Sequence, residues 1–138
     1  MASAPAVPNI ALVTNAALLA YVASAILIAC GSAYLAPTRT VAASFGAISA
    51  DSRRMLIMEW MAEGITHISI GLLVILATAI AGAGDPTTQL VYVVSAGILV
   101  VLAGLTAGTG ARTPVIWFRV CPFVLTSSAA LLVLARLM

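Results

Sequence analysis

Apolar residues form four long runs along the chain, separated by short segments that contain proline, glycine and charged residues. The runs lie at residues about 10–35, 55–81, 89–107 and 115–134. Each has about 20 residues or more, the length at which a helix crosses the hydrocarbon core of a bilayer. The alternation of apolar and polar residues that is typical of a membrane β-barrel is missing. The pattern therefore predicts an all-α integral membrane protein.

The segments between the runs predict how the helices are connected. The first helix should end at Ala36-Pro37, because proline cannot continue a helix and disfavours it in the preceding residue. Residues 38–52 are too long for a tight turn and predict a re-entrant or interfacial segment. Residues 82–86 and 109–114 are rich in turn-forming residues. We expect residues 1–138 to form one transmembrane domain, an antiparallel four-helix bundle.

The spacing of glycines indicates which helices pack closely. Gly64 and Gly71 lie seven residues apart in the second run, and Gly97 and Gly104 repeat that spacing in the third. Gly104 and Gly108 also form a G-x-x-x-G pair. Small residues let helix backbones approach each other within a membrane. We expect the second and third helices to be tightly packed neighbours, and the bundle to make homo-oligomeric contacts or to serve as a complex subunit.

The composition supports membrane insertion and excludes several other classes. Hydrophobic residues make up 63% of the 138 residues and charged residues 7%, whereas about a quarter of a soluble domain is charged. The net charge of +2 comes from six arginines and no lysine, without a basic stripe. This charge is too small to indicate nucleic-acid binding. The lipid bilayer is the predicted partner.

The arginines predict the orientation in the membrane. Four of the six lie in the first and third connections: Arg39, Arg53, Arg54 and Arg112. Connections rich in arginine and lysine stay in the cytoplasm. We therefore expect a multi-pass protein of the cell membrane with both termini extracytoplasmic.

Ionisable side chains within the second run are the candidate site. Glu59, Glu63 and His67 are spaced at i, i+4 and i+8, on one helical face. Such residues are costly inside a membrane and usually functional. Arg119 enters the fourth run from the same side, so it could pair with Glu59 or Glu63. Since one arginine cannot neutralise two carboxylates, the remaining one should share a proton or be protonated.

These residues predict a membrane-embedded acid–base enzyme for a small lipophilic substrate, of the isomerase, cyclase or hydrolase type. Glu63 would be the acid–base group and His67 its partner. Glu59 and Arg119 would be the electrostatic frame around them.

Two tryptophans near the same depth and a glycine complete the predicted site. We expect Trp60, Trp117 and Tyr34 near the cytoplasmic interface, where aromatic residues form a belt. Trp60, Trp117 and Gly64 are the predicted substrate-binding residues. At Gly64 a ligand or a neighbouring helix can approach the backbone closely.

Three alternatives to the enzyme use the same residues. The charges could form a structural ion pair that fixes the bundle, or a proton-coupled site in a small transporter or channel subunit. The chain could also be an accessory subunit of a larger membrane enzyme complex. A closed, drug-sized pocket beside Glu63 would favour the enzyme, and a water path to both faces would favour transport. A dry, ion-paired Glu63 with broad apolar outer faces would favour the subunit.

The cysteines and the histidine do not predict a metal or a cofactor. Cys30 and Cys121 are isolated, without C-x-x-C or zinc-like spacing, and are expected to act as small hydrophobes. E-x-x-x-E-x-x-x-H places three ligands on one face, but dinuclear carboxylate sites draw on several helices and use E-x-x-H pairs. One histidine cannot supply both axial ligands of a haem. We expect no metal and no cofactor.

Residues 31–73 contain Ala36-Pro37 at the end of the first run, then Phe45-Gly46, and then Gly64 and Gly71 in the second run. In these features the segment resembles part of the DoxX-like group of small four-helix membrane proteins. The resemblance implies a four-helix membrane architecture, and some members of that group are associated with quinone or thiol oxidation. The glutamates and the histidine of the second run are not part of the shared pattern.

The predicted orientation is testable by cysteine labelling. An impermeant thiol reagent applied to intact cells should mark a cysteine introduced at Ser3, because the amino terminus is expected outside. A cysteine at Ser49, in the first connection, should be protected until the membrane is permeabilised. The reverse pattern would contradict the orientation.

Overall fold

The computed structural model describes residues 10–113 and 115–138, and within them every regular element is a helix. The elements are α1 (Ile10–Leu35), α2 (Thr38–Ser44), α3 (Ala50–Ala81), α4 (Pro86–Gly108), the 3₁₀ helix η1 (Gly110–Arg112) and α5 (Ile116–Leu137). Helices α1, α3, α4 and α5 are long and apolar enough to cross a membrane. The predicted all-α membrane bundle is confirmed. Ser3 and Pro114, used in the predictions above, lie outside the described residues.

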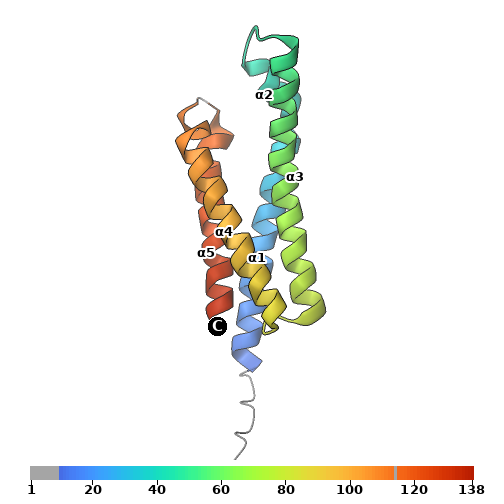
Figure 1. Cartoon of the computed structure of the whole chain (residues 1–138), viewed down its shortest axis with the longest axis vertical. Coiled ribbons are helices and arrows are strands. Elements are labelled where there is room, and N and C mark those ends of the chain that lie inside the picture. The colour runs from blue at the N-terminus through green and yellow to red at the C-terminus, as the bar shows by residue number, and fades with distance from the viewer. Residues whose placement is uncertain (1–9, 114) are drawn as a thin grey trace, which may run out of the picture.

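The helices are arranged as two pairs. Helix α1 packs mainly against α3, and α4 against α5, while α1 also runs along α5. Figure 1 shows that α1 begins, α5 ends and α3 turns into α4 at one end of the bundle. The two pairs diverge toward the other end, which carries α2 and η1 (Figure 1). Helices α3 and α4 make the weaker contact, so the expectation that they are tightly packed neighbours is wrong.

The glycines of α3 pack against α1 instead. A Cβ atom on Gly31 would lie 2.5 Å from the carbonyl oxygen of Gly64, and one on Gly71 would lie 2.9 Å from that of Ser24. By contrast, a Cβ atom on Gly97 or Gly104 would have no neighbour within 4 Å. The spacing in α3 did indicate a close helix contact. Sequence spacing does not identify the partner helix. Gly97 and Gly104 of α4 have the same spacing, but they face open space.

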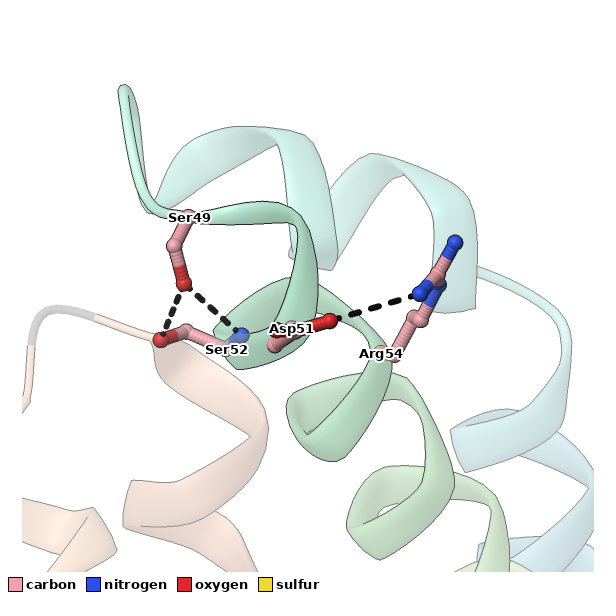
Figure 2. Close-up of polar contacts among 4 residues, drawn as sticks. All are labelled: Ser49, Asp51, Ser52 and Arg54. Atoms are coloured by element: carbon pink, nitrogen blue, oxygen red, sulfur yellow. Dashed lines mark hydrogen bonds and ion pairs between the residues drawn. The ribbon is translucent and has the colours of Figure 1, made fainter.

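Helix α3 begins at Ala50, five residues before the predicted start. The side chain of Ser49 accepts a hydrogen bond from the backbone N–H of Ser52 at 3.1 Å, which caps the helix (Figure 2). Arg54 and Asp51 form an exposed ion pair at 3.3 Å beside this cap. Exposed pairs of this kind contribute little to stability. The hydrogen-bonded cap therefore accounts for the early start of the helix.

The remaining connections are also closed by local hydrogen bonds. The guanidinium of Arg53 donates to the backbone carbonyls of Ala42 and Gly46, which ties the segment around α2 to α3. Asp85 caps α4 by accepting from the N–H groups of Thr87 and Thr88 at 2.8 and 3.2 Å. Because the cap precedes Pro86 and proline suits a first helical position, α4 begins three residues before the predicted residue 89.

The outer faces of the four long helices carry exposed apolar side chains, including Leu76, Val101 and Phe123. The inner faces of α1 and α3 carry small residues, and Ala20 and Ser24 are fully buried. An apolar exterior around a packed interior is what contact with lipid requires. The predicted oligomer stays a prediction.

The contact between α1 and α3 can be tested with alanine. Gly31→Ala should lower the thermal stability of the purified protein, because the new methyl group meets the backbone of Gly64. Overpacking of this kind costs about 1–3 kcal/mol. Gly97→Ala is the matched control and should leave stability unchanged or raise it, since alanine favours helix where space is open. Equal unfolding temperatures of the two variants in detergent, followed by circular dichroism, would contradict the packing.

Candidate functional site

The predicted acidic face turns from the surface into the bundle along α3. Glu59 is exposed, Glu63 is half-buried and His67 is 0% exposed. Four helical residues rotate by about 400°, so each step of this series moves the side chain about 40° around the helix. The three residues therefore share a broad face but not one environment. Glu63 and His67 lie on either side of the midpoint of α3.

Other helices bring further polar side chains to Glu63 and His67. The thiol of Cys121 on α5 donates to Oε1 of Glu63 at 3.7 Å, and Cys121 is buried. The donor atoms of Glu63, His67 and Cys121 all lie within 4.8 Å of one another. We call these three residues the buried polar cluster. Cys30 of α1 adjoins Cys121 and His67, and Thr106 of α4 adjoins Glu63, so all four long helices meet here.

The imidazole of His67 has no hydrogen-bond partner in the described part of the chain. Both ring nitrogens are buried and unpaired. The rings of His67 and Tyr34 pack edge to face, with centroids 5.7 Å apart and an interplanar angle of 89°. Buried polar groups normally have a partner. Neither nitrogen is thus used in a hydrogen bond within the described residues, and the Cys30 thiol adjoins the ring.

Aromatic rings close the cluster toward the end that carries α2. The rings of Tyr34 and Trp60 stack with centroids 4.7 Å apart, and Phe118 meets Trp60 edge-on at 5.0 Å. Trp60 Nε1 also donates to the backbone carbonyl of Tyr34. This carbonyl lies in the last turn of α1, where carbonyls lack helical partners. Trp60 therefore joins α3 to the end of α1.

Two of the three aromatic residues expected in an interfacial belt are buried inside the bundle, and their depth in the membrane stays a prediction. Trp60 is 3% exposed and Tyr34 is 1% exposed, so both are interior residues. Trp117 is 38% exposed and fits a position facing outward.

A pocket of about 670 Å³ opens between α3 and α4, where the two helix pairs diverge. It is lined mainly by apolar residues, with Glu59 and Glu63 in its wall. The lining residues are Phe45, Leu56, Glu59, Trp60, Ala62, Glu63, Thr66, Leu102, Leu105, Thr106, Thr109, Gly110, Thr113 and Phe118. Leu105 is 61% exposed, so the pocket is open at its side.

The predicted substrate-binding residues are placed in three different surroundings. Trp60 lines this pocket. Trp117 lines a second pocket of about 470 Å³, between α2 and the start of α5. Gly64 lines neither pocket and packs against Gly31 and Leu35 of α1. The binding roles assigned to these residues stay predictions.

The expected ion pair of Arg119 with a glutamate is not formed in the described residues, whose one ion pair joins Arg54 to Asp51. Arg119 is exposed on α5. Two helical residues rotate by about 200°, so Arg119 points away from the bundle when Cys121 points into it. The side chain that meets Glu63 from α5 is a thiol rather than a guanidinium.

Sequence analysis did not identify Cys121, Cys30 or Tyr34 as parts of the site. Cys121 and Glu63 lie at similar depths when residues are counted from the same side of the bundle. This similar depth was the signal in the sequence that could have brought Cys121 into the site. The rotation of α5 about its own axis decides which residue at that depth faces α3. Neither composition nor spacing specifies that rotation, because α5 has apolar residues on all sides.

Comparisons of the chain with protein-family models, with curated proteins and with solved structures found no match. The resemblance to DoxX-like proteins therefore stays a prediction.

The junction made by Trp60 is testable by substitution. Trp60→Phe keeps an aromatic ring but removes the donor to the Tyr34 carbonyl, so it should lower the stability by about 1 kcal/mol, the usual net value of a hydrogen bond. Trp117→Phe is the control, since no hydrogen bond of Trp117 is found in the described residues. Thermal unfolding of the two variants in the same detergent provides the measurement. A larger loss for Trp117→Phe would contradict the junction.

Proposed function

We propose that this membrane protein binds a small lipophilic molecule in the pocket between α3 and α4 and that Glu63, assisted by His67, transfers a proton to or from it. The observation that carries the proposal is the pocket of about 670 Å³ with Glu63 in its wall. Pockets for small molecules have about 300–1,000 Å³ and combine apolar walls with a few polar groups. The reaction class is proton transfer, as in an isomerase, a cyclase or a hydrolase.

The surroundings of Glu63 support a chemical rather than a structural role. No cation lies within ion-pair distance of Glu63 in the described residues, so its carboxyl group is not held by a salt bridge. The Cys121 thiol contacts it at 3.7 Å. His67 lies one helical turn further along α3 and has no hydrogen-bond partner among the residues that the structure describes. A half-buried carboxyl group beside a free imidazole is a suitable acid–base pair.

The packing on the other side of His67 favours this proposal over a transport pathway. Val74, Leu99 and Leu125 are each 0% exposed, and they fill the interior toward the end at which α1 begins and α5 ends. Water reaching both faces would be expected of a channel or transporter. The pocket is open at its side, so it is not the closed pocket expected of an enzyme, but its filled lower end argues against a path that reaches both faces.

A photoreactive residue can identify the molecule that enters the pocket. Benzoylphenylalanine introduced at Leu105, an exposed lining residue, should form an adduct with a small lipophilic compound when native membranes are irradiated. Mass spectrometry of the purified protein would identify the adduct. Ala62→Phe should suppress it, because a phenyl ring at this lining position fills the pocket. A yield that is unchanged by Ala62→Phe would argue against binding in the pocket.

With the compound identified, two glutamine variants test the chemistry. Glu63→Gln should lower the rate of its conversion by about 10²–10⁴-fold, the usual contribution of a general acid or base, while the protein stays folded. Glu59→Gln removes the exposed carboxylate of the same face and should have a much smaller effect. If both variants lose the same activity, or if Glu63→Gln unfolds the protein, the assignment of Glu63 is wrong.

A further inference from the structure

The buried polar cluster brings together three different metal-binding groups from two helices. The carboxylate of Glu63, an imidazole nitrogen of His67 and the thiol sulfur of Cys121 lie within 4.8 Å of one another. In a tetrahedral zinc site with bonds of 2.0–2.3 Å, the ligand atoms are separated by about 3.3–3.8 Å. The Cys121–Glu63 distance of 3.7 Å already falls in this range. Small rotations of the three side chains would complete the geometry.

The position of His67 points independently to a ligand. Its side chain is 0% exposed, and both of its nitrogens lack a hydrogen-bond partner in the described residues. A structural histidine in such an interior would be expected to use at least one nitrogen. Glu63 and His67 also stand at i and i+4, which places two ligands on one side of a helix. This is the spacing by which a helix contributes two ligands to one metal ion.

The charges of the cluster suit a divalent cation. A carboxylate, a thiolate and a neutral imidazole together carry a charge of −2, and the described residues contain no arginine paired with Glu63. An uncompensated charge is costly in the membrane interior. A divalent cation would make the cluster neutral as a whole. The metal would thus supply the counter-charge that Arg119 was expected to give.

We infer that Glu63, His67 and Cys121 bind a divalent transition-metal ion of the zinc class. The thiolate disfavours Mg²⁺ and Ca²⁺, which prefer oxygen ligands, and the carboxylate disfavours Cu(I), which prefers sulfur. Three protein ligands leave a fourth position open, as in catalytic zinc sites. A bound metal would occupy the carboxylate of Glu63 and the imidazole of His67, so the metal site and the proposed proton transfer are alternative uses of the same side chains. Metal binding does not require a molecule in the pocket, so the two can fail separately.

Cobalt(II) is the probe for this site, because it substitutes for zinc and reports thiolate ligation by a sulfur-to-metal charge-transfer band. The reduced, purified protein in detergent should bind one Co²⁺ per chain with this band, and Zn²⁺ should abolish it. Cys121→Ser should lose the band. His67→Ala should weaken binding by at least about 100-fold, because even outer-shell partners change metal affinity by 10–100-fold.

Two controls make the assignment specific. Cys30→Ser removes the adjoining thiol and should retain the band, and Ser69→Ala changes an exposed residue of α3 near His67 and should retain full affinity. If Cys121→Ser does not fold, the test is the effect of Zn²⁺ on thermal unfolding. Zn²⁺ should raise the unfolding temperature of the wild-type protein and should not raise that of His67→Ala. The absence of a thiolate band in folded wild-type protein would overturn the inference. So would a band that survives in Cys121→Ser or disappears in Cys30→Ser.

The experiment also separates the metal site from the proposed function. Ala62→Phe fills the pocket and leaves all three ligand residues in place, so it should retain the cobalt band even where the lipophilic adduct is lost. Retention of the adduct in a protein that shows no cobalt band would overturn the metal site alone.

Discussion

The close approach of α1 and α3 is the contact on which the rest of the structure depends. Gly31 and Gly64 lie against each other's backbones, with no room for a Cβ atom. In lipid, helices gain little from burying apolar side chains against each other, so close packing of backbones is a principal source of association. This contact fixes the register of α1 on α3. It thereby places Tyr34 beside Trp60 and His67.

A polar cluster in this position has consequences that it would not have in a soluble protein. Water cannot readily replace a missing partner in the middle of a membrane bundle, so an unpaired group there remains costly. A carboxylate at Glu63 therefore needs a positive charge beside it, and no arginine lies near enough to supply one in the described residues. The proposed proton transfer and the inferred metal site are two responses to this one constraint. In both, the function depends on a group that the fold leaves without a protein counter-ion.

Much of the fold was predictable from the sequence, and only part of the site was. Run lengths and prolines gave four spans, and the predicted limits of the first match Ile10–Leu35. Side-chain caps at Ser49 and Asp85 begin α3 and α4 earlier in the chain than hydropathy alone indicated. The face of Glu63 and His67 followed from helical periodicity. Its partner from α5 did not, because hydropathy fixes the depth of a residue but not the rotation of an apolar helix. For that reason Arg119 was expected where Cys121 lies.

The open side of the pocket affects how occupancy must be measured. A lipophilic molecule of the kind proposed above would enter between α3 and α4, past the exposed Leu105, from the bilayer in which it is concentrated. Its occupancy then follows its concentration in the lipid, which for a lipophilic compound greatly exceeds that in the aqueous phase. An apparent dissociation constant referred to the aqueous phase would change with the amount of lipid or detergent in the sample. Affinities for this protein are therefore comparable only as mole fractions in the membrane.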